Sequence, residues 1–151
     1  MAWTFGLVVA VWFNTMKTWI YIAIPFTSWF VAGVLKFLIN CLRERRLAID
    51  LIGYGGMPSN HSAIVASISC LIGLREGFDS AVFGVSLTFV FIVTMDANSL
   101  RMAIGRHAAA INKLADGELN LRERMGHSKI EIVAGLLTGC SVAFLMNSLS
   151  I

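Results

Sequence analysis

The sequence predicts an all-α polytopic membrane protein with about four to five transmembrane helices plus an amphipathic helix in the loop 99–114. Two observations of composition predict this class: 57% of the 151 residues are hydrophobic and only 14% are charged, and the mean hydropathy is +0.75. Soluble domains have a more polar composition. The third observation is that apolar stretches long enough to cross a bilayer alternate with short polar ones. The length is that of one domain, so we treat 1–151 as a single membrane-embedded unit.

The first half of the chain predicts three helices. Residues 1–16 are apolar but too few to span a hydrocarbon core of about 30 Å, so we expect a short interfacial or half-inserted helix, or an extra helix, there. Residues 19–40 are apolar apart from Lys36 and form the first spanning helix, which tolerates Pro25 inside it. Residues 63–74 form a shorter helix that is barely long enough to cross the hydrocarbon core. We expect it to be tilted, flanked by neighbours or partly re-entrant.

The second half predicts two further spanning helices, over 81–95 and 130–149. Between them lies a polar segment, 96–129, with an amphipathic helix over 99–114 and a turn at 115–117. Gly135 and Gly139 have the spacing that lets membrane helices approach closely. The pair predicts helix packing and is also a candidate contact for a homo-oligomer.

Four spanning helices place the loops at 36–50 and 96–131 on the same side of the membrane. These loops carry ten of the twelve basic residues, namely Lys36, Arg43, Arg45, Arg46, Arg101, Arg106, Lys113, Arg122, Arg124 and Lys129. By the positive-inside rule we expect this side to be cytoplasmic. No basic run is interleaved with aromatic residues, so we expect no nucleic-acid partner. The three cysteines are far apart and indicate neither a disulfide framework nor a zinc site.

The loop from Gly55 to Ser62 reads Gly-Gly-Met-Pro-Ser-Asn-His-Ser. Two glycines give the backbone access to φ values that other residues avoid, and Ser59 or Asn60 can cap the helix that follows. The backbone N–H groups and the dipole at such a helix start favour an anion. His61 adds a titratable proton donor there. The same pattern is compatible with an ordinary capped turn whose histidine faces water.

A second stretch, Gly-His-Ser-Lys-Ile-Glu at 126–131, leads into the last spanning helix. His127 and Glu131 are four residues apart, which places them on one face of a helix if that turn is already helical. The carboxylate can then accept the Nδ1 proton of the imidazole and leave Nε2 available as a nucleophile or base. Upstream, Arg122 and Arg124 have guanidinium groups that suit phosphate oxygens. The alternative is an interfacial ion pair beside arginines that reach toward lipid headgroups.

Together these stretches resemble the type 2 phosphatidic acid phosphatase and vanadium haloperoxidase superfamily, specifically its short, divergent branch of small membrane proteins. Phosphatases of that superfamily are helical and use three motifs: Lys, six residues, Arg-Pro; Pro-Ser-Gly-His; and Ser-Arg, five residues, His, three residues, Asp. The segment from Asp96 to Arg101, Asp-Ala-Asn-Ser-Leu-Arg, resembles the branch's Asp-Ala-x-Gly-Val-Arg. The resemblance covers about residues 22–146.

The first two motifs carry over in part. Lys36 and Arg43 keep the first spacing, but Glu44 stands where the family has proline. Pro58, Ser59 and His61 match the second motif, with Asn60 in place of its glycine.

The third motif departs further from the family pattern. His127 and Glu131 match, but the acid is one methylene longer and the gap from Arg122 is one residue short. His107 follows Arg101 at the family's spacing, yet isoleucine occupies the position of its acid. We favour His127 as the nucleophile because it has a carboxylate partner, and His107 stays an open alternative.

The resemblance implies hydrolysis of a phosphate monoester through a phosphohistidine. His127 would attack phosphorus, Glu131 would orient it, and His61 would be the general acid. The phosphate would be held by Lys36, Arg43, Ser59, Arg101 and Arg122, with Asp96 near the same face. We expect neither a metal nor a cofactor, because side chains supply the cations. A phosphate held beside apolar helices suggests a lipid phosphate substrate that comes from the bilayer.

Two other readings remain. The altered third motif is compatible with a lipid-phosphate-binding or assembly protein that has weak catalysis or none. The ionisable groups Asp96 and Glu131, with the histidines, are also compatible with an ion pathway. Their positions at loop edges argue against transport, because the centres of the helices are almost free of charge.

Overall fold

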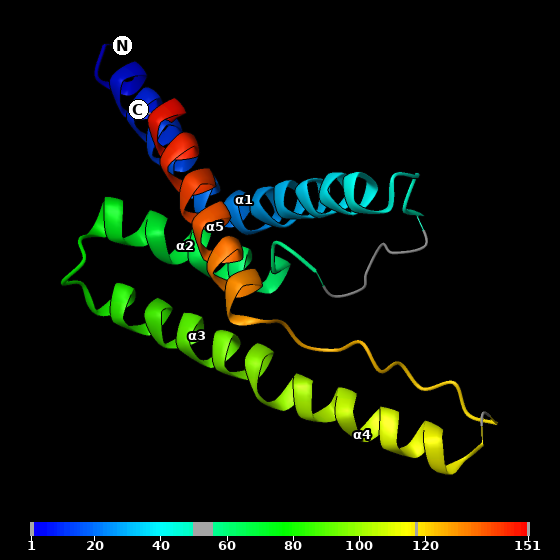
Figure 1. Cartoon of the computed structure of the whole chain (residues 1–151). Helices are drawn as coiled ribbons and strands as arrows, with labels where there is room; N and C mark the ends of the chain where they lie inside the picture. The colour runs from blue at the N-terminus through cyan, green and yellow to red at the C-terminus, as the bar shows by residue number, and fades with distance from the viewer. Residues whose placement is uncertain (1, 50–55, 117, 151) are drawn as a thin grey trace.

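The computed structural model describes residues 2–49, 56–116 and 118–150, and gives the backbone alone for residues 2–17. These parts form five helices and no strand. The helices are α1 (Ala2–Glu44), α2 (Asn60–Glu76), α3 (Ala81–Asn98), α4 (Leu100–Leu114) and α5 (Lys129–Leu149), as Figure 1 shows. The all-helical prediction is therefore confirmed. Parts of two expected loops, including Asp50, Gly55 and Gly117, lie outside the described residues.

The start of the chain differs from the sequence prediction. Residues 2–17 are not a separate short helix but the first part of α1, which continues without a break to Glu44. Neither glycine nor proline lies between Phe13 and Trp19, so no residue there ends a helix. Pro25 lies inside α1, as expected.

Three helical stretches in the described residues are long and apolar enough to cross a membrane: Thr18–Glu44, Ala81–Leu114 and Lys129–Leu149. The second of them joins α3 to α4 through Ser99, and α4 is the expected amphipathic helix. The predicted short helix, α2, has 17 residues and so measures about 25 Å. It packs against α1, α3 and α5. The prediction that neighbouring helices flank it is confirmed.

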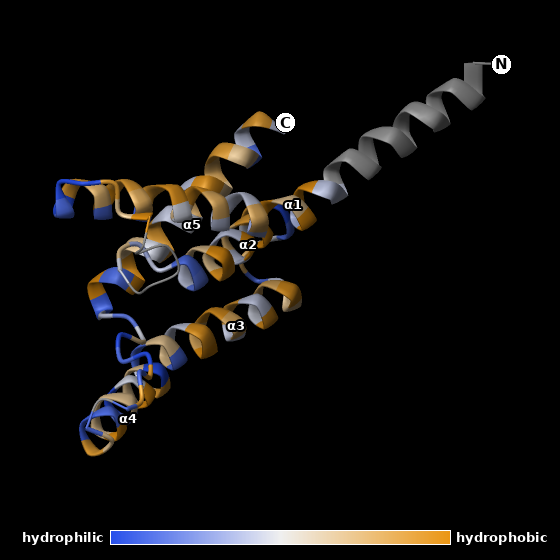
Figure 2. Ribbon diagram, turned by 90° about the vertical axis from the view of Figure 1, so that its right-hand side faces the viewer, coloured by the Kyte–Doolittle hydropathy of each residue, from blue (hydrophilic) through white to orange (hydrophobic). Residues whose placement is uncertain are grey.

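The polar connections gather at one end of the bundle. Residues 45–49 after α1 and 56–59 before α2 lie at the same end as α4 and residues 118–128, which lead to α5, whereas the α2–α3 turn lies at the opposite end (Figure 1). Figure 2 shows hydrophilic residues concentrated at the first of these ends. The described parts of the two basic loops therefore share one end of the bundle, as the helix count predicted.

The α2–α5 contact depends on small residues. A Cβ atom on Gly135 would lie 2.4 Å from the backbone oxygen of Ser59, and one on Gly139 would lie 2.3 Å from that of Ala63. On α2 the facing residues are small as well, and Ser59, Ser62 and Ala63 are fully buried. The two helix backbones therefore lie in direct contact. The glycine face of α5 is occupied by α2 of the same chain.

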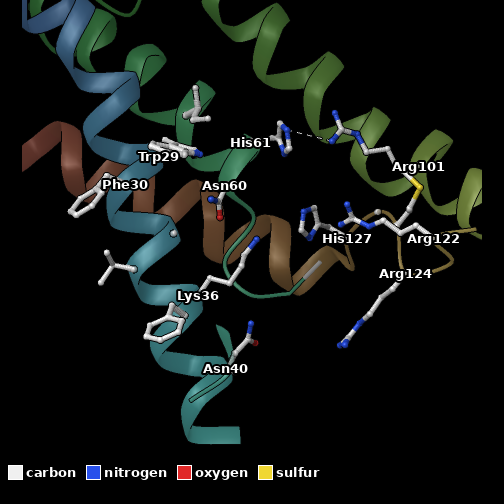
Figure 3. A pocket seen from close by; sticks show the side chains of 17 residues that line it. Trp29, Phe30, Lys36, Asn40, Asn60, His61, Arg101, Arg122, Arg124 and His127 are labelled. Atoms are coloured by element: carbon white, nitrogen blue, oxygen red, sulfur yellow. Dashed lines mark hydrogen bonds between the residues drawn. The ribbon is translucent and has the colours of Figure 1, made fainter. Parts of the chain in front are cut away.

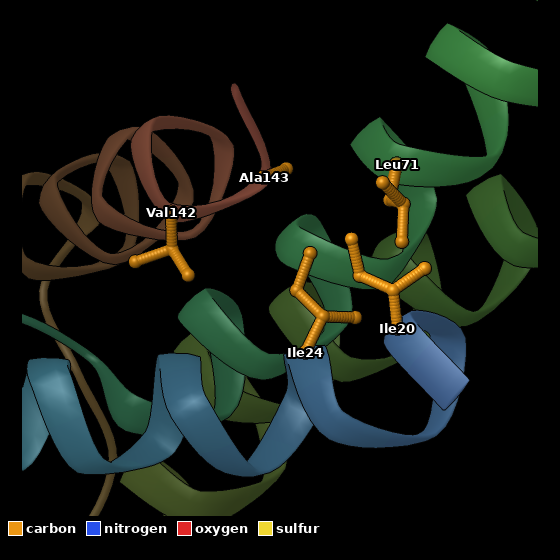
Figure 4. Packing of buried hydrophobic residues seen from close by; sticks show 5 residues of the cluster. All are labelled: Ile20, Ile24, Leu71, Val142 and Ala143. Atoms are coloured by element: carbon orange, nitrogen blue, oxygen red, sulfur yellow. The ribbon is translucent and has the colours of Figure 1, made fainter. Parts of the chain in front are cut away.

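The apolar core lies further along the same helices, toward the other end. Ile20 and Ile24 of α1 meet Leu71 of α2, and Val142 and Ala143 of α5 complete the cluster (Figure 4). Its members are at most 7% exposed.

At that end a set of polar contacts ties the same three helices together. Tyr21 donates a hydrogen bond to Glu76, and the Nε of Arg75 donates to the Oδ1 of Asn147 over 2.8 Å. These contacts anchor the bundle at the end away from the basic loops.

We expect Gly139→Ala to lower thermal stability, because the added methyl group would collide with the α2 backbone. Overpacking of this kind costs about 1–3 kcal/mol. Gly84→Ala is the matched control, since apart from the neighbouring backbone of its own helix nothing lies within 4 Å of the added Cβ there. Melting temperatures of the purified proteins in one detergent would test this. Equal melting temperatures for the wild type and Gly139→Ala would contradict the packing described here.

Candidate functional site

A cavity of about 630 Å³ opens at the end of the bundle where the basic loops meet. α1, α2, α4 and the segment before α5 all contribute to its walls. Among the described residues its lining is Trp29, Phe30, Gly33, Val34, Lys36, Phe37, Asn40, Ala48, Asn60, His61, Ile64, Arg101, Arg122, Arg124, Met125, Gly126 and His127. Four of these are cationic and none is acidic. Figure 3 shows the three arginines and His127 on one side, Trp29 and Phe30 on the α1 side, and Lys36 reaching from α1 toward His127.

His61 is placed by the start of α2. Ser59 is the N-cap, and its Oγ accepts a hydrogen bond from the N–H of Ser62 over 3.4 Å. The N–H of Ser59 in turn donates to the backbone oxygen of Glu131 over 3.0 Å. The predicted capping is confirmed. It fixes the first turn of α2 against the first turn of α5, so His61 enters the cavity from a rigid helix start.

His127 is placed by a capping box at the start of α5. Ser128 is the N-cap, its N–H donates to the Oε2 of Glu131 over 2.8 Å, and its Oγ accepts from the Glu131 N–H. The same carboxylate oxygen lies 3.5 Å from the Nδ1 of His127. This contact is longer than a good hydrogen bond. The helix begins two residues after His127, and the capping box brings the acid back to the imidazole.

The backbone of His127 is also held by α3. Its N–H donates to the carbonyl oxygen of Ala97 over 2.9 Å. Gly126 has φ +82°, and a Cβ there would lie 2.8 Å from the backbone nitrogen of Met102. Glycine is therefore required at this bend.

Arg101 links an acid to the other histidine. Its Nε donates to the Oδ2 of Asp96 over 2.6 Å, and its Nη1 lies 3.5 Å from the Nε2 of His61. Figure 3 shows the guanidinium and this imidazole facing each other. Asp96 thus fixes the direction in which Arg101 presents its charge.

Burial and neighbouring cations act on both imidazoles in the same direction. Burial lowers the pKa of His127 below the ordinary value for histidine, and the charge of Lys36 lowers it further, while Glu131 opposes these effects. Burial also lowers the pKa of His61, with Arg101 and Lys36 acting in the same sense. Without a bound anion, both side chains therefore favour the neutral form at neutral pH.

The extended segment 118–128, here called the strap, brings two arginines and His127 to the cavity. Asn112 of α4 holds it. Its Nδ2 donates to the backbone oxygen of Leu121 and to Oε1 of Glu123, each over 2.8 Å, and its Oδ1 accepts from the Leu121 N–H over 2.9 Å. One amide side chain thus fixes the strap immediately beside Arg122.

The structure brings five of the sequence-predicted residues together in the cavity lining: Lys36, His61, Arg101, Arg122 and His127. Glu131 and Asp96 lie behind them, each in contact with a lining residue. Three others are not in the lining. Arg43 is exposed near the end of α1, His107 is exposed on α4, and Ser59 is fully buried in its capping role.

The predicted site did not include Asn40 or Asn60, and Arg124 was noted for its guanidinium but not assigned to the phosphate-binding set. The aromatic wall of α1 was not predicted. Signals were present for some of these. Asn40 follows Lys36 by four residues, one helical turn, and Arg124 follows Arg122 by two. For the aromatic wall, the spacing shows only which residues share a face of α1, and not that the face lines a cavity.

Comparison with known proteins gives two matches. The model of a family described as the Divergent PAP2 family matches residues 18–142. An uncharacterized membrane protein of Bacillus subtilis (strain 168), YuiD, is 35% identical, and the aligned region covers 72% of this chain and 81% of that protein. No solved structure matches the chain.

We expect Asn112→Ala to release the strap. Each of its hydrogen bonds contributes a net of about 0.5–1.5 kcal/mol, and the loss should raise amide hydrogen exchange in residues 118–126 about tenfold or more. Lys113→Ala, at the neighbouring exposed position, is the control. Hydrogen exchange followed by mass spectrometry would measure both variants. Unchanged exchange in Asn112→Ala would show that other contacts hold the strap.

Proposed function

Because the chain belongs to the Divergent PAP2 family, we propose that this integral membrane protein is a metal-independent phosphatase that hydrolyses a lipid phosphate monoester through a phosphohistidine. One observation carries the proposal. Two histidines and four cations, drawn from α1, α2, α4 and the strap, line one cavity at the end of a membrane bundle.

The charges near the cavity suit a phosphate monoester. Lys36, Arg101, Arg122 and Arg124 line it, and two carboxylates stand behind, one on Arg101 and one beside His127. The four cations and two carboxylates have a net charge of +2, which matches a dianionic monoester. Guanidinium groups also provide the planar donor geometry that phosphate oxygens accept.

In the first step, the Nε2 of neutral His127 attacks phosphorus and the bond from phosphorus to the alcohol oxygen breaks. Glu131 beside Nδ1 stabilises the positive charge that develops on the ring. The cations compensate the charge on the equatorial oxygens. His61 gives a proton to the leaving alkoxide. A bound dianion next to His61 raises its pKa and so supplies the protonated form that the unoccupied site disfavours.

In the second step, water attacks the phosphohistidine. His61, now neutral, takes a proton from that water, the bond from phosphorus to Nε2 breaks, and inorganic phosphate leaves. His127 returns to its neutral form. The lowered pKa of His127 supports both steps, because only an unprotonated Nε2 can act as the nucleophile.

A second candidate is a lipid-phosphate-binding protein with weak catalysis or none. The observation that favours it is the geometry of Glu131, whose carboxylate accepts the capping-box hydrogen bond and lies 3.5 Å from the imidazole. An acid that is shared in this way orients a nucleophile less well than one devoted to it. The cavity would then hold the anion without efficient turnover.

We also propose that the cavity faces the cytoplasm, because the two loops that border it carry most of the basic residues. Arg46 and Lys113 are both exposed at this end. Cysteines introduced at these positions should react with a membrane-impermeant maleimide only after the cells are permeabilised. Labelling of intact cells from outside would reverse the orientation.

The function is tested by phosphate release from phosphatidic acid, phosphatidylglycerophosphate, a prenyl phosphate and a soluble ester. We expect His127→Ala to abolish release, because it removes the nucleophile, and His61→Ala to slow it about 10²–10⁴-fold. His107→Ala is the control and should retain activity, since that histidine lies outside the cavity.

Three outcomes would count against parts of this proposal. Turnover that survives His127→Ala would exclude it as the nucleophile. Equal rates on soluble and lipid esters would contradict a lipid substrate. Binding of lipid phosphate by the folded wild type without any release would favour the binding protein.

A further inference from the structure

The cavity has two chemically different sides. The histidines and arginines come from α2, α4 and the strap. α1 contributes Lys36 and Asn40 and, beside them, an apolar wall of Trp29, Phe30, Gly33, Val34 and Phe37. Figure 3 shows Trp29 and Phe30 on the side away from Arg101 and Arg122. A phosphate group needs only the cationic side, and the apolar side has no part in the chemistry proposed above.

This wall continues onto the lipid-facing surface of α1. Phe26, Phe30, Gly33 and Phe37 follow at intervals of four, three and four residues, which places them along one face of the helix. Phe26 is 69% exposed and Phe30 is 64% exposed, on a helix that is long and apolar enough to cross a membrane. The row therefore leads from the bilayer into the cavity, where it ends near Lys36.

Gly33 is the gap in this row, and it differs from the glycines that pack helices. The nearest atom to an added Cβ is the Nδ2 of Asn60, at an ordinary contact distance of 3.7 Å. Close backbone packing, as at Gly135 and Gly139, therefore does not require glycine there. Glycine in a helix is less favourable than alanine by about 1 kcal/mol. What the missing side chain at Gly33 provides is space inside the cavity.

We propose that the α1 wall, formed by Trp29, Phe30, Gly33, Val34 and Phe37, is the binding subsite for the hydrocarbon chain of the lipid phosphate. The chain enters from the bilayer along the aromatic row, and Gly33 sets the room that it has beside the phosphate. This inference rests on the proposed function for its ligand class. Its test, however, can be made on binding alone and so does not depend on turnover.

The experiment measures how strongly each variant prefers a chain. The purified protein in nanodiscs binds decyl phosphate, butyl phosphate or inorganic phosphate in competition with one labelled phosphate ligand. The readout is the affinity ratio of decyl phosphate to inorganic phosphate. Partition of decyl phosphate into the nanodisc is the same for every variant, so it cancels when variants are compared.

Gly33→Leu fills the space beside Lys36 and should lower this ratio about tenfold, which corresponds to the loss of contact with roughly two methylene groups. Affinity for inorganic phosphate should stay within about twofold, a change of less than 0.5 kcal/mol. Gly84→Leu is the matched control, because Gly84 is a helical glycine with open space that lies outside the cavity lining. An unchanged ratio in Gly33→Leu, or an equal fall in Gly84→Leu, would overturn the proposal.

A second pair of variants covers the case in which Gly33→Leu does not fold. Phe30→Ala removes part of the wall without touching the buried core and should lower the same ratio, while Phe89→Ala, 60% exposed on α3, should not. An unchanged ratio in Phe30→Ala would overturn the proposal.

Turnover distinguishes the two proposals. A wild type that prefers decyl phosphate but releases no phosphate would disprove the phosphatase and leave the chain subsite standing. Hydrolysis of lipid phosphate that Gly33→Leu does not slow would support the phosphatase and overturn the chain subsite.

Discussion

The direct contact between the start of α2 and the start of α5 is the constraint on which the rest of the site depends. Gly135 allows the α5 backbone to reach that of Ser59, and the Ser59 N–H completes the contact by donating to Glu131. The turn that carries His61 and the turn that carries His127 are thereby fixed to each other. A side chain at Gly135 would push the two helices apart and separate the two imidazoles, which come from segments more than sixty residues apart in the chain.

α3 and α4 position the other residues of the site relative to these two histidine-bearing turns. α3 holds the backbone of His127 through Ala97 and supplies Asp96, which directs Arg101 toward His61. α4 holds the strap through Asn112. The result is a cationic surface next to an apolar one, at the end of a membrane bundle. Electrostatic attraction is stronger there than in open water, because burial lowers the effective dielectric constant.

Much of this arrangement could be predicted from the sequence. The composition and the apolar stretches indicated a helical membrane bundle, and the helix count correctly placed the basic loops at one end. Ser59 was one of the two residues predicted to cap α2. Glu131 was correctly paired with His127, although a capping box and not a shared helical face brings them together. These predictions succeeded because each depends on local periodicity or on a short motif, which the chain carries without reference to its neighbours.

Other features depend on tertiary contacts and could not be read in this way. Arg43 keeps a motif spacing from Lys36, but its side chain lies in the exposed end of α1, outside the cavity lining. The role of Asn112 depends on the path of the strap, which has no periodic signal. The join between residues 2–17 and the rest of α1 was missed for a different reason: residues 1–16 were treated as a separate helix because they are too few to span the bilayer, although nothing after them stops a helix.

The central claim is that the two histidine turns form one site in which phosphate is transferred to His127. The most direct measurement is to mix the wild type with a lipid whose phosphate is radioactive, stop the reaction with alkali during turnover, and map the label. The account predicts a label on His127 that is stable in alkali and lost in acid, and no label in His127→Ala. Turnover without any labelled protein, or a label on another residue, would contradict it.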